Sequence, residues 1–441
     1  MKTRVLFGLI TLLFIPLISC HKNDADNITV AASVKFMVIS DIHYFDPSLF
    51  SFPLNPSFQA YLAGDRKLIA ESSAILQNVL ASVLTAKPDF LLITGDLTKD
   101  GEKFDHQALA VLFKALSDKG IKVLVIPGNH DVNNPSSYSY LQSARTKIDN
   151  VTAADFASIY ADCGYGNAVE RDPGSLSYVS EPVSGVWILG IDACQYSPLS
   201  LTAGTLSAGT LTWVKSIIDK SKQQNKILIS MMHHGLTEHF SGQSTLFPEY
   251  IISDWQNISA ALADYGLTVV FTGHFHAQDI TKITGAKGFS FDIETGSTVT
   301  YSCPYRMVTL NTLSKSLQIS SGKIDGITFS TIPAGTNFQQ YAKEYLNAGT
   351  KLVSYGMLSA PPYGIPAATI TALQLDRIMA NAFVAHSSGD ELPSASDNSD
   401  IQTVKTTIPL FAGAVEGVWT DLAPADNKVI LNLATGTSVD N

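Results

Sequence analysis

The chain is poor in cysteine and in positive charge. Only four of its 441 residues are cysteines and none forms a CxxC pair, so the sequence supports neither a disulfide framework nor a cysteine-based zinc site. Besides Cys20 these are Cys163, Cys194 and Cys303, which we interpret as buried thiols. Lys and Arg number 29 against 39 Asp and Glu, a formal net charge of −10. Without clusters of basic residues, we expect no nucleic-acid partner.

The N-terminus has the order of a secretory signal. Lys2 and Arg4 precede an apolar stretch over residues 5–17, which is too short to span a bilayer. The LISC sequence that follows resembles a bacterial lipoprotein signal, in which Cys20 carries the lipid anchor. An ordinary signal peptide cut nearby is the alternative. We therefore expect a protein of the bacterial cell envelope, attached to the membrane through its N-terminal lipid, or secreted or periplasmic if it is not lipidated.

Six apolar runs rich in β-branched residues predict strands buried on both faces. They cover residues 35–40, 90–94, 121–127, 186–192, 226–232 and 267–272. Apolar residues recur at helical spacing over residues 68–83, and again over 109–116 before Gly120. This alternation predicts an α/β layered domain.

The pattern of apolar residues changes after the last of these runs. Short strand-like pieces from Gly288 onward predict a second sheet, so that two sheets pack together between helices. Helical patterns follow from Phe338, with a Ser/Asp-rich break near residues 393–400. We divide the chain into a signal (1–20), a tether (21–32), an α/β domain (33–328) and a smaller helical C-terminal region (329–441).

Side chains that can bind metals follow five of the predicted strands. They are Asp41 and His43, then Asp96, then Asn129, His130 and Asp131, then His233 and His234, and finally His274 and His276. The carboxyl ends of strands in open α/β sheets share one crevice, so we expect these side chains to converge. Residues two apart in extended backbone point the same way, which lets both members of the first and last pairs face one centre.

Seven of these residues provide enough donors for two metal ions. Asp41, His43, Asp96, Asn129, His233, His274 and His276 exceed what one four-coordinate ion needs, and they suit two ions that share a bridging carboxylate. Imidazole, carboxylate and amide donors together favour Mn, Fe, Zn or Co over Mg or Ca. Neighbours on a strand point to opposite faces, so only one of the two adjacent histidines is expected to bind; we choose His233 and keep His234 as the alternative.

Taken in order, the blocks DIH, GD, GNHD, HH and GHFH resemble the calcineurin-like metallophosphoesterase family, over residues 36 to about 310. The resemblance implies a four-layer α/β/β/α sandwich with a dinuclear metal site at the strand ends. It implies that Asp41, His43 and His276 hold one metal, that Asn129, His233 and His274 hold the other, and that Asp96 bridges them. His130 matches the family's non-ligand histidine, which stabilises the transition state and protonates the leaving oxygen.

One departure from the family concerns the group that positions His130. Many members have a GDxxD sequence whose second carboxylate orients the catalytic histidine, whereas here Lys99 takes that place and Asp100 follows it. Asp100 or another group would have to substitute. We also assign Asp131 to the catalytic set, as the residue that orients either the loop or the imidazole.

The resemblance implies hydrolysis of phosphoric esters, monoesters or diesters, by a hydroxide that bridges two divalent metals, with His130 as general acid. The expected partner is a small phosphorylated substrate. A metal-stabilised binding protein without turnover is the alternative, which the intact His130 disfavours, and a nuclease is disfavoured by the acidic charge. Three other histidines are assigned to structural roles: His106 at an exposed helix start, His239 beside the pocket, and His386 in a polar cluster at a helix end.

Overall fold

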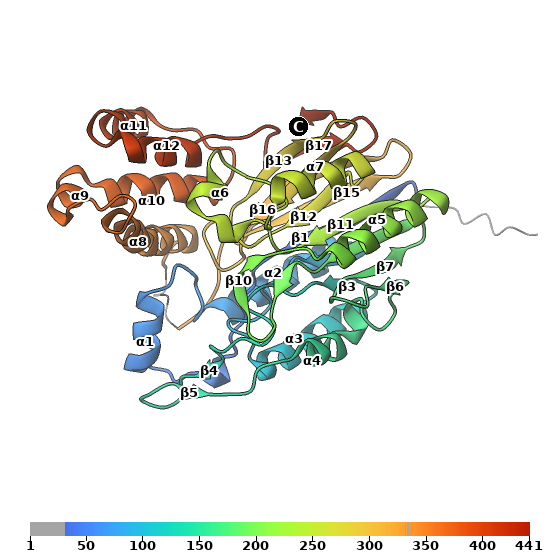
Figure 1. Ribbon diagram of the computed structural model, residues 1–441. Helices are drawn as coiled ribbons and strands as arrows, with labels where there is room; N and C mark the ends of the chain where they lie inside the picture. Colours follow the sequence, from blue (N-terminus) through green and yellow to red (C-terminus); the bar gives the residue numbers. More distant parts are fainter. Residues whose placement is uncertain (1–30, 331, 333–334) are drawn as a thin grey trace, which may run out of the picture.

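Two seven-stranded sheets form the centre of the computed structural model, which describes residues 31–441 except 331, 333 and 334 (Figure 1). The signal, most of the tether and the lipid-anchor candidate Cys20 lie outside the described residues. In the part of the chain that is described, no helix combines the length and the apolar character needed to cross a membrane.

The first sheet has the order β18-β17-β16-β15-β1-β2-β3. Its strands are β1 (Ser33–Ile39), β2 (Phe90–Ile93), β3 (Lys122–Val125), β15 (Pro304–Asn311), β16 (Ser316–Lys323), β17 (Lys428–Asn432) and β18 (Ser438–Asp440). β1, β2 and β3 run parallel, and β15 joins β1 antiparallel. The three parallel strands therefore end at the same edge.

The second sheet has the order β13-β14-β12-β11-β8-β7-β6. Its strands are β6 (Glu170–Arg171), β7 (Tyr178–Val183), β8 (Val186–Ile191), β11 (Ile227–Met232), β12 (Val269–Thr272), β13 (Asp279–Thr284) and β14 (Phe289–Glu294). β8, β11, β12 and β14 are parallel, with antiparallel strands at both sides. All six strands predicted from apolar runs are present.

The two sheets pack against each other, and helices cover their outer faces. Phe36 of β1 contacts Phe271 of β12 edge to face at 5.6 Å, and the Tyr178 hydroxyl of β7 donates to the Val125 carbonyl of β3 at 2.9 Å. The apolar faces of α2 (Ser72–Ala86) and α3 (Lys103–Ser117) share the core of the first sheet. Those of α5 (Ala208–Gln223) and α7 (Trp255–Tyr265) bury the other face of the second sheet. This is the predicted four-layer α/β/β/α sandwich.

Shorter elements lie mainly in the loops at the carboxyl ends of the strands. They are α1 (Pro56–Ala63), α4 (Ala153–Ile159), α6 (Gln243–Leu246), β4 (Tyr138–Ser139), β5 (Thr146–Lys147), β9 (Cys194–Gln195) and β10 (Leu201–Gly204), with 3-10 turns at Pro47–Leu49, Ala161–Cys163 and Pro248–Tyr250. The three described cysteines are free thiols; Cys163 and Cys303 are buried as expected, and Cys194 is half-buried.

The helical C-terminal region packs as a separate group of helices beside the sandwich (Figure 1). It comprises α8 (Phe338–Ser359), α9 (Ala367–Leu373), α10 (Leu375–His386), α11 (Ala395–Thr407) and α12 (Pro409–Val418). Its apolar core also includes Phe240 and Phe275 of the sandwich, so the two parts share buried surface.

Two features of the C-terminal sequence differ from the expectation. The predicted break near residues 393–400 lies earlier, at 387–394 between α10 and α11. α11 begins within the predicted range because Ser394 and Asp397 form a reciprocal capping box, and these residue types favour helix starts as much as loops. After α12 the chain returns to the sandwich, where β17 pairs with β16 and extends the first sheet. These last strands were missed because they are short and follow a long helical segment.

Candidate functional site

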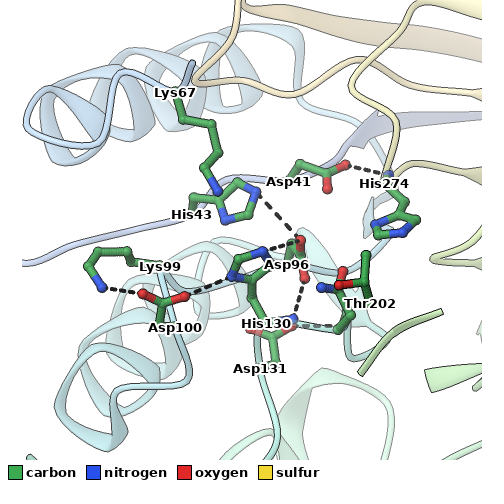
Figure 2. Close-up of polar contacts among 12 residues, drawn as sticks. Asp41, His43, Lys67, Asp96, Lys99, Asp100, His130, Asp131, Thr202 and His274 are labelled. Atoms are coloured by element: carbon green, nitrogen blue, oxygen red, sulfur yellow. Dashed lines mark hydrogen bonds and ion pairs between the residues drawn. The ribbon is translucent and has the colours of Figure 1, made fainter. Parts of the chain in front are cut away.

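The side chains predicted to bind metal meet where the carboxyl ends of the strands of the two sheets lie next to each other. Asp41, Asp96 and Asn129 follow β1, β2 and β3 of the first sheet, whereas His233 and His274 follow β11 and β12 of the second. Figure 2 shows several of these side chains pointing into one space. The site therefore forms at the contact of two sheets.

Asp96 lies between two groups of donors. Its Oδ2 is 3.5 Å from Nε2 of His43, and its Oδ1 is 3.5 Å from Nε2 of His233. Asp41, His43, Asp96 and His276 place one ligand atom each within 4.8 Å of one another, as do Asp96, His233 and His274. One carboxylate thus belongs to both metal-binding groups.

The first group consists of acceptors that face one another. Nε2 of His276 is 3.3 Å from Oδ1 of Asp41 and 3.3 Å from Nε2 of His43. Burial lowers the pKa of both imidazoles. Burial alone would raise the pKa of Asp41, but His276, His233 and Ser40 together outweigh it and bring the pKa to about 2. An ionised carboxylate beside neutral imidazoles is the form that binds a divalent cation.

The second group also offers atoms that can bind a cation. Nδ1 of His233 donates to the Thr94 carbonyl at 2.9 Å, so in the neutral ring Nε2 carries the lone pair; this atom is 3.1 Å from the Asn129 amide oxygen. His274 donates through Nε2 to the Glu249 carbonyl at 3.2 Å, which leaves Nδ1 free to accept. Burial lowers the pKa of His274. These donor sets fit two divalent cations that share Asp96.

The backbone holds most of these side chains in strained conformations. Positive φ angles occur at Asp41 (49°), His43 (37°), Asp96 (48°), His274 (76°) and His276 (69°). Left-handed backbone costs a residue with a Cβ atom roughly 1–2 kcal/mol. Such strain gathers at functional sites, where the surrounding fold enforces it.

Two glycines allow the loops to approach one another. A Cβ atom on Gly128 would lie 2.1 Å from Oδ1 of Asp96, and one on Gly273 would lie 2.5 Å from Oδ2 of Asp41. Both carboxylates would be displaced by any larger residue. The glycines noted before Asn129 and His274 are thus explained by close packing.

The adjacent histidines point to different places. His233 faces Asp96, whereas His234 donates through Nε2 to the Thr202 carbonyl of β10 at 2.8 Å. The geometry therefore places His233 within the second donor group and His234 outside it.

His130 lies beside the donor groups, and Asp100 orients it. The His130 amide donates to Oδ1 of Asp96 at 2.9 Å, and the imidazole Nε2 is 4.0 Å from the other Asp96 oxygen (Figure 2). Nδ1 of His130 contacts Oδ1 of Asp100 at 2.9 Å. Burial lowers the pKa of His130, but Asp96 and Asp100 outweigh it and raise the pKa overall. The carboxylate one place later than in the GDxxD pattern thus holds the imidazole.

Lys99 forms an ion pair with Asp100 that holds this carboxylate in place. Its ammonium group pairs with Asp100 and with Glu102 at 3.1 Å, and it is fully buried. The rings of Tyr61 and Tyr140 lie 4.8 and 5.6 Å from the ammonium, a setting in which cation–π attraction replaces part of the lost hydration. Lys99 and Asp100 therefore act as one ion pair that presents a carboxylate to His130.

Asp131 orients the loop and does not contact the imidazole. Its buried carboxylate accepts the amides of Leu97, Thr98 and Gly128 at 3.1, 3.0 and 2.8 Å. It does not line the pocket in front of His130. Of the two roles considered, the geometry supports the loop.

The expectation for His106 is wrong. It is fully buried within α3, where Nδ1 lies 2.9 Å from the Tyr160 hydroxyl and Nε2 lies 3.1 Å from the Asp131 carbonyl. Helical spacing does not reveal that a second layer, α4 and its following turn, covers this face. A structural role for His106 stays a prediction.

A cavity of about 150 Å³ opens in front of Asp96 and His130. Its walls include side chains that the sequence did not single out: Asp65, Arg66, Lys67, Thr202 and Tyr250. The Tyr250 ring packs on His274 at 4.6 Å. An Arg-Lys pair in an acidic chain is a weak signal, and the other three residues lie in segments with no periodic pattern.

Comparison with known proteins identifies the family of the chain. A family model described as calcineurin-like phosphoesterase matches residues 34–278. Solved structures with a similar fold include a dimetal phosphatase from Danio rerio (12% identity, TM-score 0.44, covering 66% of this chain and 96% of that one) and a purple acid phosphatase from yellow lupin (10%, 0.40, 66% and 52%). GAP50 of Plasmodium is another (10%, 0.33, 72% and 95%). No curated protein sequence matches the chain.

Replacing Gly128 tests whether the close approach to Asp96 sustains metal binding. Gly128→Ala is expected to displace the Asp96 carboxylate and to weaken metal binding by about 10- to 100-fold, as when a partner of a ligand is removed. Gly356→Ala in α8 is the control, because a Cβ atom there meets nothing within 4 Å. Titration of each purified variant with Zn²⁺ or Mn²⁺ measures the effect. Equal affinities in both variants would contradict the packing argument.

Proposed function

Because the chain belongs to the calcineurin-like phosphoesterase family, we propose that it hydrolyses esters of phosphoric acid at a dinuclear metal centre. The observation that carries the proposal is the position of Asp96, shared by two donor groups and bonded to the backbone of His130. The family consists of phosphoesterases; turnover by this chain and the roles of its residues are our inference.

Each donor group would hold one divalent cation. Asp41, His43 and His276 would hold the first, Asn129, His233 and His274 the second, and Asp96 would bridge them. Bound cations of this kind neutralise phosphoryl oxygens and acidify a water molecule. Mixed nitrogen and oxygen donors favour Mn, Fe, Zn or Co.

His130 would act on the leaving group. Its Nδ1 is engaged by Asp100, so Nε2 is the atom available to the substrate. The imidazole side chain is 26% exposed and lines the cavity. Asp96 and Asp100 raise the pKa of His130 against the effect of burial, which favours the protonated ring that a general acid requires. In this role His130 donates its Nε2 proton to the departing alkoxide.

The cavity indicates a small substrate. At about 150 Å³ it accommodates a phosphoryl group and the atoms next to it, since sites for whole drug-sized ligands are several times larger. Arg66 and Lys67 add positive charge on its wall, which suits an anion. Both monoesters and diesters meet these conditions.

A binding protein without turnover is the second candidate, and the geometry around His130 disfavours it. Lys99 and Asp100 are buried charges whose arrangement serves to hold one imidazole beside the donor groups. A protein that only binds metal would have no need of this non-coordinating histidine.

Two substitutions separate the proposed roles. Asp96→Ala is expected to lose turnover and the metal bound at the two donor groups, because it removes the ligand that they share. His130→Ala is expected to keep its metal and to lose about 10²–10⁴-fold in rate, the usual contribution of a general acid. Metal analysis and assays on aryl and alkyl mono- and diesters with Mn²⁺ or Zn²⁺ measure both. Parental rates in His130→Ala would show that the acid assignment is wrong.

The Asp100 carboxylate is expected to matter for rate but not for metal content. Asp100→Asn should lower turnover by about 10–100-fold, the range for partners that orient a functional group, and Asp100→Glu should restore part of it. Asp118→Asn is the control, because this exposed carboxylate pairs only with Lys114 on the outside of α3. Metal content is compared in parallel. An unchanged rate in Asp100→Asn would mean that His130 is oriented by another group.

We also propose the envelope location that the N-terminal sequence predicts. The proposal rests on Lys2, Arg4, the apolar stretch over 5–17 and Cys20. A phosphoesterase anchored there by a lipid would act on substrates outside the cytoplasm.

Substitution of Cys20 tests the lipid anchor. Cys20→Ser in a bacterial host is expected to move the protein from the membrane fraction to the soluble fraction, because the serine hydroxyl cannot be lipidated in this pathway. Cys194→Ser provides the matched control. If both variants fractionate with the parent in the membrane, the anchor lies elsewhere; if the parent itself is soluble, there is none.

A further inference from the structure

A second cluster of buried charged side chains lies behind the metal-binding loop, where the helical region meets the sandwich. Asp279 begins β13 three residues after His276, His386 ends α10, and Glu391 lies in the loop that follows. The rings of Phe240 and Phe275 pack against the His386 imidazole at 5.2 and 5.7 Å. Phe275 stands between His274 and His276 in sequence, so the cluster contacts the candidate active-site loop.

Three of these side chains have ligand atoms close together. Asp279, His386 and Glu391 place one such atom each within 4.8 Å of one another. Nδ1 of His386 lies against Oε1 of Glu391. Their exposed fractions are 0% for Asp279, 1% for His386 and 6% for Glu391. We name Asp279, His386 and Glu391 the interdomain triad.

Each member of the interdomain triad also has a polar atom without a partner. Among the described residues, Oδ2 of Asp279, Nε2 of His386 and Oε2 of Glu391 are buried and make no hydrogen bond. A buried polar atom without a partner costs about 1–3 kcal/mol. Oδ2 of Asp279 and Oε2 of Glu391 belong to side chains that meet at the Nδ1 side of His386, and such unpartnered oxygens indicate a missing ligand better than they indicate a closed network.

Two neighbouring carboxylates differ from those of the interdomain triad in that main-chain amides bind them. Asp292 accepts the amides of Leu236 and Thr237, and Asp426 accepts those of Ile280 and Asp390. These two are satisfied by the backbone. Among the carboxylates of this cluster, Asp279 and Glu391 are therefore those that keep a buried oxygen without a hydrogen bond. Nε2 of His239 and Nε of Arg306 are also without one among the described residues.

His239 and Arg306 supply positive charge nearby, and both make hydrogen bonds within the cluster. Nδ1 of His239 donates to Oδ1 of Asp279 at 2.6 Å, which leaves Oδ2 on the other side of that carboxylate. The Arg306 guanidinium donates to the main-chain carbonyls of Asp279, Glu294 and Asp426. His239 thus orients Asp279 as an outer partner orients a metal ligand.

We propose that the interdomain triad binds a third divalent cation, which fastens the helical C-terminal region to the active-site loop. One imidazole and two carboxylates suit Zn²⁺ or Mn²⁺. All three side chains are buried, so the cation has a structural role. This assignment replaces the purely structural one given to His386 from sequence.

Metal content of the full chain tests the proposal. After loading with Zn²⁺ alone and desalting, the parent is expected to hold about three Zn²⁺ per chain and Glu391→Gln about two, because the amide removes a charged ligand without changing its size. His386→Ala should behave in the same way. Glu416→Gln in α12, whose carboxylate pairs with Lys405 at the surface, should match the parent. Parental zinc content in both triad variants would overturn the proposal.

A second comparison separates this site from the proposed dinuclear centre. Asp96→Ala is expected to retain about one Zn²⁺, and Zn²⁺ should raise its melting temperature, since a ligand that binds only the folded state stabilises it. In the Asp96→Ala/Glu391→Gln double variant both effects should disappear. Persistence of the zinc-induced shift in the double variant would refute the triad site. A parent with one Zn²⁺, lost in Glu391→Gln but not in Asp96→Ala, would instead refute the dinuclear centre.

Discussion

The shared carboxylate of Asp96 is the constraint on which the site depends. Its two oxygens face His43 on one side and His233 on the other, and one of them also accepts the amide of His130. These three partners come from loops after different strands, so the carboxylate fixes the relative position of both sheets. The lack of a side chain on Gly128 is what allows the Asn129 loop to come this close.

Building such a site works against stability in several ways. Acceptors that face one another repel unless a cation lies between them, and five of the participating residues adopt left-handed backbone. The surrounding layers compensate through burial: between the sheets, Phe36 stacks on Phe90 and meets Phe271 edge to face within the core. The strain is tolerated because strands packed on both faces leave the loop ends little freedom to relax.

The helical C-terminal region and the sandwich are packed together as one structural unit. Its core includes Phe240 and Phe275, and the chain leaves it to form β17 and β18 in the first sheet. The region is thus held at both ends by the sandwich. Charged groups at its inner boundary contact the loop that bears His274 and His276, so the position of the helices and the shape of the site are linked.

The sequence alone determined the sandwich and the residues that meet at its edge. Short, continuous apolar runs rich in β-branched residues predict strands buried on both faces, and the residues that end parallel strands gather at one edge. The sequence could not decide contacts between side chains from distant segments. Four such contacts depend on how layers and loops pack in three dimensions. Asp100 holds His130, and His234 turns to Thr202. His106 is covered by α4, and Asp279, His386 and Glu391 meet. Local periodicity reports which face of an element is apolar; it carries no information about which other element will cover that face.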